Sequence, residues 1–361
     1  MNICLIGNNL TNLVLANILI DRKIKVDLYL TSQKKKIFND RTLGISEKNI
    51  NFLKKNKIYL EKIIWPIKKI QIFNEKNKNN KILEFKNDKH NCLSILKNYY
   101  LYNILKRKLD KNILFKKRII KSNSYLKNIL NNYDIVINSD QNSFISKKYF
   151  SKKVFKNYKS HAYTGTITHK KCRNHAAMQI FTKYGPLAFL PISETKTSLV
   201  FSILDQKNLK EKDVKDLINK YNFNYKIYSI SKISKFKLKF SLLRKYFYKN
   251  ILAFGECIHQ IHPLAGQGFN MSLRDIETLV KIIDEKLELG LEIDSSILEV
   301  FEKRKKPSNF IFSSGIDFIY EFFKFDNKIK NNFSNNIFDY VNNKPLLNEY
   351  LKNLADKGLI F

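Results

Sequence analysis

The sequence predicts a mixed α/β fold in which a Rossmann-like sheet is interrupted by a β-rich lobe and followed by C-terminal helices. An apolar run that ends at Gly7 precedes a helix-like segment, Leu10–Asp21, and a second apolar run, Ile24–Leu30, which is the strand–helix–strand opening of such a sheet. Residues 161–240 then change to short strand-like runs. The strand–helix character returns at 250–288, so we expect the first domain to be discontinuous.

The remaining elements follow from periodicity and turn residues. Helices show apolar positions three or four apart, and strands show alternation or short apolar runs bounded by turn signals. The expected elements are an amphipathic helix within 41–60 after a turn, a hairpin over 66–85 with its turn at 75–80, a helix over 99–109, strands at 133–138, 163–169, 178–182, 188–191 and 198–204, a helix near 209–221, strand-like sequence over 225–241, and aromatic-striped helices from 298.

This order predicts three parts. A chain of 361 residues is long enough for two lobes, and no low-complexity linker separates them. The predicted parts are a Rossmann-like domain made of 1–65, 92–160 and 245–295, a β-rich domain made of 66–91 and 161–244, and a C-terminal helical region, 296–361.

The composition favours a folded protein in a reducing compartment. The net charge is +34, but it comes almost entirely from lysine, with only eight arginines, and the lysines run through every segment. Nucleic-acid surfaces favour arginine gathered on one face, so we expect no nucleic-acid partner and rank compositional drift first and attraction to an anionic membrane second. The four cysteines form no CxxC pair, and the N-terminal sequence predicts neither a signal peptide nor a membrane span.

The most informative stretch is residues 254–275, FGECIHQIHPLAGQGFNMSLRD. Pro263, Gly266 and Gly268 lie between a strand-like run and a helix-like run, in a chain with only ten glycines. A helix that begins after Gly-x-Gly directs free N–H groups and the positive end of its dipole toward a ligand, which suits an anionic or electron-rich group. An ordinary strand–loop–helix connection would explain the glycines but not the whole string.

Three strings, in the same order, resemble a known family. These are Arg41-Thr-Leu-Gly-Ile-Ser46, Gly185-Pro-Leu-Ala-Phe-Leu-Pro191 and the Gly255–Asn270 string, and the tail over Asn343–Gly358 adds to them. The chain is similar to the flavin-dependent aromatic hydroxylases of ubiquinone biosynthesis, within the larger p-hydroxybenzoate hydroxylase-like group. The resemblance implies that the Rossmann-like part is an FAD-binding domain and that the inserted β-sheet is a substrate domain.

The resemblance also implies the residues of the cofactor site. The Gly266-Gln267-Gly268 loop, with Pro263 and Asn270, would lie against the flavin ring, whose N1/C2 edge would face the helix N-terminus. Glu256, after Gly255, would accept a hydrogen bond from the ribityl chain, and Arg41 would hold the phosphate–ribityl region. Glu256 as a solvated carboxylate and Arg41 as a surface charge remain alternatives. His259 and His262 could be read as a metal pair, but a packing role is favoured and no metal is expected.

The sequence departs from the family at the nucleotide end. The opening loop should read Gly-x-Gly-x-x-Gly, yet Gly7 is followed by Asn9 and Asn12, and Asn12 is expected to push the helix off the sheet. The acid expected for the adenosine ribose falls at Leu30. The second phosphate-side motif keeps Asp140 but has lost both glycines.

The nucleotide end of the site departs from the family, whereas the flavin end matches it, and two functions follow from this difference. The first is an FAD-dependent monooxygenase that hydroxylates the ring of a polyprenylated phenol in ubiquinone biosynthesis, with no catalytic residue assignable. The second is a non-catalytic binding or assembly component of the quinone-biosynthesis complex, and a third, weaker reading is a halogenase or polyprenyl reductase of the same fold. The substrate and the charge predict a cytoplasmic protein attached peripherally to the inner face of the cytoplasmic membrane, with other ubiquinone-biosynthesis proteins as possible partners.

Overall fold

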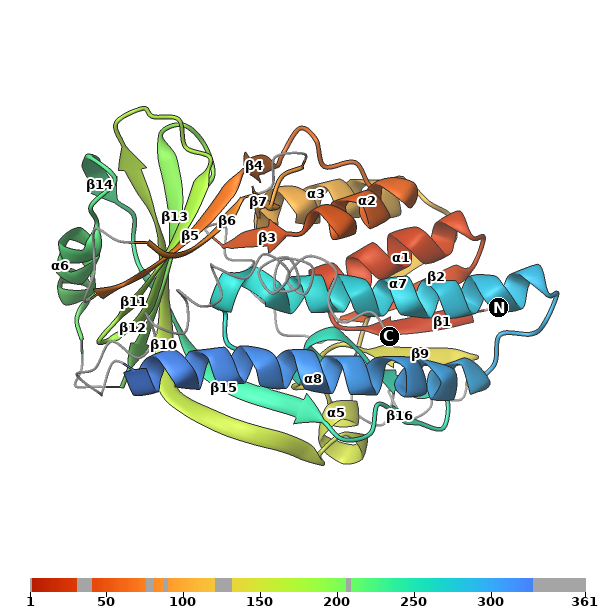
Figure 1. Ribbon diagram of the computed structural model, residues 1–361. Helices are drawn as coiled ribbons and strands as arrows, with labels where there is room; N and C mark the ends of the chain where they lie inside the picture. Colours follow the sequence, from red (N-terminus) through yellow and green to blue (C-terminus); the bar gives the residue numbers. More distant parts are fainter. Residues whose placement is uncertain are drawn as a thin grey trace.

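A computed structural model of the chain describes residues 2–30, 41–75, 81–86, 90–120, 132–205 and 209–326. The molecule has two lobes, and two long helices, α7 (Gln267–Glu288) and α8 (Ser296–Asp326), run from the edge of one lobe along the other (Figure 1). One lobe is built on a parallel sheet and the other on a larger, mostly antiparallel sheet. The fold class expected from the sequence is confirmed.

The parallel sheet has the strand order β16-β17-β9-β1-β2-β8. Its central strands β1 and β9 are mostly apolar because both faces are covered. Helix α1, which is buried nearly all round, packs against β1 and β2 and against α3. The elements of this lobe are β1 (Asn2–Ile6), α1 (Leu10–Asp21), β2 (Lys25–Leu30), α3 (Asn98–Leu109), β8 (Phe115–Ile119), β9 (Ile135–Asn138), α5 (Phe144–Tyr149), β16 (Phe247–Tyr248) and β17 (Ile251–Ala253).

The larger sheet has nine strands in the order β18-β15-β10-β13-β12-β11-β5-β6, with β14 paired to β10. All its pairings are antiparallel except that of β11 with β5. Helix α6 packs its apolar face on this sheet. The elements are β5 (Lys69–Asn74), β6 (Lys81–Lys86), β10 (Lys153–His169), β11 (Ala176–Thr182), β12 (Gly185–Pro191), β13 (Lys196–Leu204), α6 (Glu211–Tyr221), β14 (Ile227–Ile230), β15 (Ser234–Leu243) and β18 (His259–Gln260).

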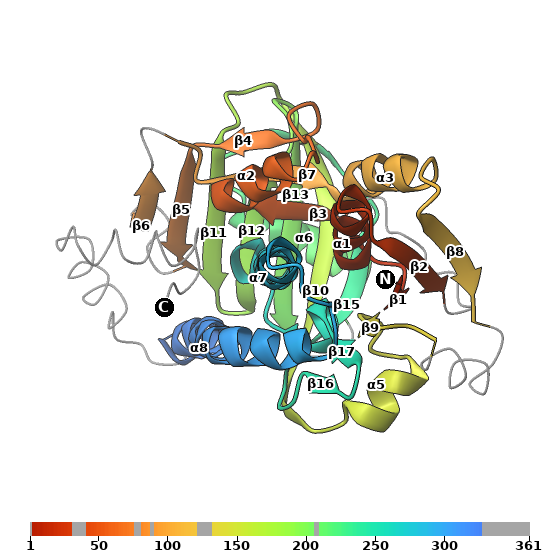
Figure 2. The same ribbon diagram turned by 90° about the vertical axis from the view of Figure 1, so that its right-hand side faces the viewer.

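A small three-stranded sheet connects the lobes. Its order is β3-β7-β4, from β3 (Thr42–Ile45), β4 (Trp65–Ile67) and β7 (Leu93–Lys97), and helix α2 (Glu47–Lys55) follows β3. The hydroxyl of Thr42 donates to that of Ser198 on β13 over 2.8 Å, which ties this sheet to the large one. Viewed end-on, α7 lies at the centre of the molecule, between the small sheet and α8 (Figure 2).

One expected element differs from the structure. The segment that begins at Arg41 forms strand β3 before its helix, and the helix ends at Lys55, so Ile58 lies after it. Up to residue 326, where the described residues end, the aromatic-striped tail forms helix α8, whose buried face includes Phe301, Phe312 and Phe323. The tail over 343–358, part of the family resemblance, lies outside the described residues.

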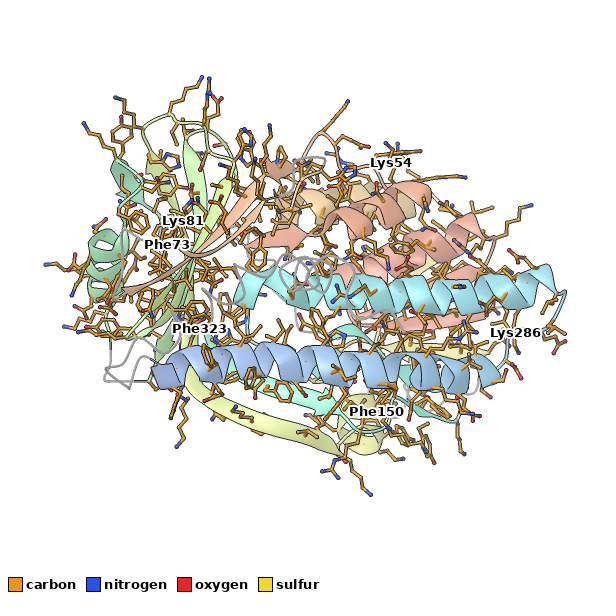
Figure 3. The ribbon with its side chains drawn as sticks, viewed as in Figure 1. Lys54, Phe73, Lys81, Phe150, Lys286 and Phe323 are labelled. Atoms are coloured by element: carbon orange, nitrogen blue, oxygen red, sulfur yellow. The ribbon has the colours of Figure 1, made fainter. Side chains whose placement is uncertain are left out.

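Lysine side chains project from several sides of the molecule. Lys54, Lys81 and Lys286 lie on different elements (Figure 3), and each pairs with a nearby carboxylate. Exposed pairs of this kind stabilise a fold by at most about 1 kcal/mol each. Among the helices of the described ranges, none combines the length and apolar character needed to cross a bilayer.

Candidate functional site

The glycine-rich string forms the N-terminus of α7, between the two lobes. A short 3-10 turn (Leu264–Gly266) follows Pro263, and Gly266 adopts the left-handed conformation with φ of 64°. A Cβ at Gly266 would lie 3.4 Å from the backbone nitrogen of Gly44 on β3. Gly266 is therefore required by its backbone angle, and its close approach to β3 brings two of the family-like strings together.

Asn270 joins these two strings. Its Nδ2 donates to the carbonyl of Gly44 over 2.9 Å, and its Oδ1 accepts from the backbone N–H of Ser46 over 3.0 Å. The same oxygen accepts from Nδ2 of Asn49 on α2 over 2.8 Å. Asn270 is buried, so it fixes α7 against β3 and α2 by satisfying groups that would otherwise be orphaned.

The first turn of α7 has the features of a ligand site. No side chain of the described part of the chain caps the helix. Gln267 is 6% exposed, and its Oε1 has no hydrogen-bond partner among the described residues. A Cβ at Gly268 would meet no atom of the described chain within 4 Å beyond its neighbours and its own helical turn. Gly268 thus leaves open space beside an uncapped helix end and a buried, unpaired acceptor.

Apolar side chains converge beside this helix end. A cavity of about 30 Å³ lies between Gly44 and Gly266 on one side and the large sheet on the other. A more open pocket of about 370 Å³ adjoins it, and Ile95 lines both. The cavity holds a single water molecule at most, so a larger ligand requires the two sides to part. Its other lining residues are Ile70, Leu93, Ile95, Ala177, Met178, Gln179, Ala188 and Leu190.

Arg41 lies at the start of β3 and faces the large sheet. Its guanidinium stands over the ring of Phe236 on β15, 4.3 Å from the ring centre. Its carbonyl accepts from the N–H of Asn98, at the start of α3. The side chain is exposed, so the position is open to solvent as well as to the interface between the lobes.

The predicted nucleotide half is built differently. Asn9 caps α1, accepting from the N–H of Asn12 over 3.0 Å, and its Nδ2 donates to Oγ of Ser139 over 2.7 Å. Asn12 is fully buried, and its amide donates to the carbonyls of Ile6 and Gly7 over 3.0 and 2.8 Å. The side chain of Asn12 is thus accommodated between α1 and β1 by hydrogen bonds.

Asp140, Gly255 and Glu256 lie around this region. Asp140 is buried, and its carboxylate accepts from the N–H of Asn142 over 2.9 Å. Gly255 has a φ of 56°, and a Cβ there would lie 3.0 Å from the side chain of Thr11. Glu256 is exposed, and its carbonyl accepts from the side chain of Gln141.

A buried ionic cluster behind the helix end was not foreseen from the sequence. Asp275 on α7 is fully buried and accepts from Nε2 of His259 over 2.8 Å and from Nδ2 of Asn309 over 3.2 Å. Nζ of Lys305 lies 3.3 Å from the same carboxylate. Burial raises the pKa of Asp275, but the charge of Lys305 and the hydrogen bond from His259 outweigh it, so its pKa lies below the ordinary value.

His262 lies in an apolar environment and does not pair with His259. Its ring stacks on Tyr320 with centroids 4.2 Å apart, and Tyr158 meets it edge-on at 5.3 Å. Neither ring nitrogen has a partner within the described residues. Burial lowers the pKa of His262 to about 3, so the side chain is neutral and serves in packing.

The fit of a flavin differs between the two halves. The α7 end fits a flavin ring, since within the described residues it offers a helix end without a side-chain cap, a buried unpaired oxygen and open space at Gly268. The α1 end does not fit a pyrophosphate as it stands, because the side chain of Asn9 accepts from the N–H of Asn12 in the first turn and bridges to Ser139.

Comparisons with known proteins agree with this geometry. A family model described as squalene epoxidase matches residues 174–348. The chain is 27% identical over 184 residues to the mitochondrial ubiquinone biosynthesis monooxygenase COQ6 of Dictyostelium discoideum, covering 40% of this chain and 37% of the relative. It is 29% identical over 161 residues to the 3-demethoxyubiquinol 3-hydroxylase of Escherichia coli K12, covering 42% and 41%. The matched part is therefore about two fifths of each relative's length.

Solved structures show the same fold over nearly the whole chain. The p-nitrophenol 4-monooxygenase PnpA of Pseudomonas putida superposes with a TM-score of 0.74 at 11% identity, covering 97% of this chain and 96% of that one. PqsL of Pseudomonas aeruginosa, described as a probable FAD-dependent monooxygenase, gives 0.70 at 14% identity and covers 91% and 97%. FAD is the cofactor that this fold implies. The chain has the fold of the FAD-dependent monooxygenases, and its sequence resembles the hydroxylases of ubiquinone biosynthesis.

Proposed function

We propose that the chain is a flavin-dependent monooxygenase that hydroxylates the aromatic ring of a polyprenylated phenol in ubiquinone biosynthesis. The observation that carries this is the first turn of α7, where an uncapped helix end, the unpaired oxygen of Gln267 and the space at Gly268 meet at one point. The names of the curated relatives support the reaction and the pathway.

The residues of the chain bind, orient and exclude water in this proposal. Gly266, Gln267 and Gly268 hold the flavin ring, and Asn270 keeps their helix against β3. The apolar cavity beside Gly266 receives the substrate ring when the lobes part and shields it from water. When bound, reduced flavin supplies the oxygen chemistry, the activation of O2 for transfer to an electron-rich ring.

Gly268→Val tests the flavin site directly. We expect affinity for flavin to fall about tenfold to hundredfold, because the branched side chain fills the space that the ring needs. The fold is expected to survive, since the described chain leaves that space open. Flavin fluorescence measures affinity and circular dichroism measures folding.

Gly315→Val on α8 is the matched control, since a Cβ there also meets no atom of the described chain within 4 Å. Flavin affinity that is equal in the two variants would contradict the site. A purified wild-type protein without the visible absorption of flavin, and unable to take up added flavin, would instead support the non-catalytic binding or assembly component.

We also propose that the protein is cytoplasmic and attaches peripherally to an anionic membrane through α8, near which its substrate resides. Ile311, Phe318 and Phe325 are spaced seven residues apart and are 45%, 70% and 59% exposed, so they form one apolar face of the helix. The net charge of +34 supports attraction to anionic headgroups. Other proteins of ubiquinone synthesis remain proposed partners.

Phe318→Ser is expected to weaken binding to phosphatidylglycerol vesicles about tenfold, because it removes a large apolar side chain from the proposed contact. Co-sedimentation with vesicles measures the effect. The control is Tyr228→Ser, which changes a side chain that is 64% exposed on β14. An equal loss in the two variants, or equal binding to neutral phosphatidylcholine vesicles, would contradict the proposed contact.

A further inference from the structure

The N-termini of α7 and α1, which would bind the two ends of the flavin cofactor, differ in their side-chain caps. The N-terminus of α7 begins at a glycine and has no side-chain cap within the described residues. The N-terminus of α1 is capped by its own Asn9, whose Oδ1 accepts from the N–H of Asn12. An anion at α1 would compete with this acceptor, whereas a ligand at α7 meets no side-chain acceptor of the described residues at the helix end.

Asn9 also spans the place where a pyrophosphate binds in this type of sheet. Strands β1 and β9 are neighbours, and the chain continues from them to opposite sides of the sheet, which makes the gap at their carboxyl ends the topological switch point. The bond from Asn9 to Ser139 crosses this gap, and Oγ of Ser139 in turn donates to the carbonyl of Ile6 over 3.2 Å. A protein hydrogen bond therefore holds the two loops together.

The backbone around this hydrogen bond also leaves little free space in the gap. A Cβ at Gly7 would lie 3.1 Å from Oγ of Ser139 and from Cβ of Asp140. The loop that follows β17 also lies close to α1, because a Cβ at Gly255 would lie 3.0 Å from the side chain of Thr11. At the end of β2, Leu30 offers no side-chain acceptor for ribose hydroxyls, and it packs against the core of the lobe.

We propose that the chain binds flavin chiefly through its ring and ribityl end and draws little affinity from the adenylate, so that FAD and riboflavin bind with similar strength. This inference rests on the proposed function and concerns the same site. In a site that uses both halves, the adenylate adds hydrogen bonds that riboflavin lacks. Here the side chain of Asn9 takes one of the helix donors, the N–H of Asn12, and its bond to Ser139 spans the gap in which the pyrophosphate would lie.

The test is titration of the full-length apoprotein with FAD and, separately, with riboflavin, followed by flavin fluorescence. We expect the two dissociation constants to agree within about fivefold, which corresponds to about 1 kcal/mol. A preference for FAD of about hundredfold or more would overturn the inference and leave the proposed function intact. Failure to bind either flavin would overturn both.

Two variants test the cause. Asn9→Gly removes the bridge, and glycine at an N-cap costs a helix only a few tenths of a kcal/mol, so the fold is expected to hold. Ser139→Ala removes the acceptor hydroxyl. Each variant is expected to raise the affinity for FAD about tenfold and to leave the affinity for riboflavin unchanged. In Asn9→Gly the pyrophosphate gains a donor of the helix, and in Ser139→Ala it gains space in the gap. Asn9→Asp keeps the capping oxygen and adds a negative charge, so it is expected to give no gain. An unchanged ratio of FAD to riboflavin affinity in both variants would overturn the inference.

Discussion

Asp275→Ala is expected to lower the free energy of unfolding by about 3–5 kcal/mol, the usual cost of removing one partner from a buried ionic cluster. Asp275 is completely buried, and the ammonium of Lys305 and the ring of His259 have their polar atoms directed at it. Without the carboxylate, Lys305 must remain in a nearly dry environment without its counter-charge or rearrange toward solvent. Either outcome loosens the contact between α7 and α8.

Chemical denaturation at neutral pH measures this loss, and Glu299→Ala is the control. Glu299 pairs with Lys303 at 2.8 Å on the same helix, α8, but both side chains are exposed, so its removal should leave stability nearly unchanged. A loss below about 1 kcal/mol for Asp275→Ala would show that the cluster is not an essential contact.

Because the pKa of Asp275 is lowered in the fold, its contribution to stability is present at neutral pH and is lost as pH falls below the ordinary carboxyl range.

The same substitution should also weaken flavin binding. His259 belongs to β18, directly before the loop that leads to Gly266, and Asp275 lies about two and a half helical turns after that glycine. The cluster therefore fixes both the entry and the body of the helix whose first turn forms the proposed flavin site. Loss of flavin affinity without loss of stability would indicate a purely local effect of the loop.

The sequence predicts the opening strands and helix of the parallel sheet and the helix after the glycine-rich string, but it does not predict strand β3, which carries Gly44. The apolar runs ending at Gly7 and at Leu30 and the helix between them form β1, β2 and α1 with the expected bounds, because both faces of a parallel sheet demand continuous apolar segments. The resemblance implies that the 266–270 string lies against the flavin ring and that Arg41, in the 41–46 string, holds the phosphate–ribityl region. That Asn270 binds one string to the other is a long-range contact, and no periodicity encodes it.

Side-chain contacts between distant elements could not be predicted from the sequence. Lys305 and Asn309 occur in a polar-looking stretch of α8, and only the packing of α8 on α7 reveals that they face Asp275. Asn12 was expected to push α1 off the sheet because its size was weighed without its hydrogen bonds. Its Nδ2 donates to the carbonyls of Ile6 and Gly7, which offsets part of the cost of burying it, while its Oδ1 has no partner among the described residues.

The second large effect expected is on the pH dependence of stability, through His262. The pKa of this ring is lowered to about 3 by burial, whereas in the unfolded chain it has the ordinary value of about 6.5. Between these two values the unfolded state binds a proton that the folded state does not, so stability falls as pH falls. The loss from pH 7 to pH 4 amounts to about 3 kcal/mol from this residue alone.

His262→Phe should remove this contribution. Phenylalanine keeps an aromatic ring against Tyr320 and Tyr158 and has no group to protonate, and the two buried nitrogens without partners disappear. Relative to wild type, the variant should therefore gain about 3 kcal/mol of stability between pH 7 and pH 4, as measured by urea denaturation at each pH.

Tyr158→Phe serves as the comparison, because it alters the same aromatic cluster without removing the imidazole. It should follow the wild-type pH dependence. If His262→Phe also follows that dependence, the ring must be as easily protonated in the fold as in the unfolded chain, which would require a partner for one of its nitrogens. The residues around it offer stacking surfaces and not acceptors for these nitrogens in the described structure, so the neutral ring is the form that the fold selects.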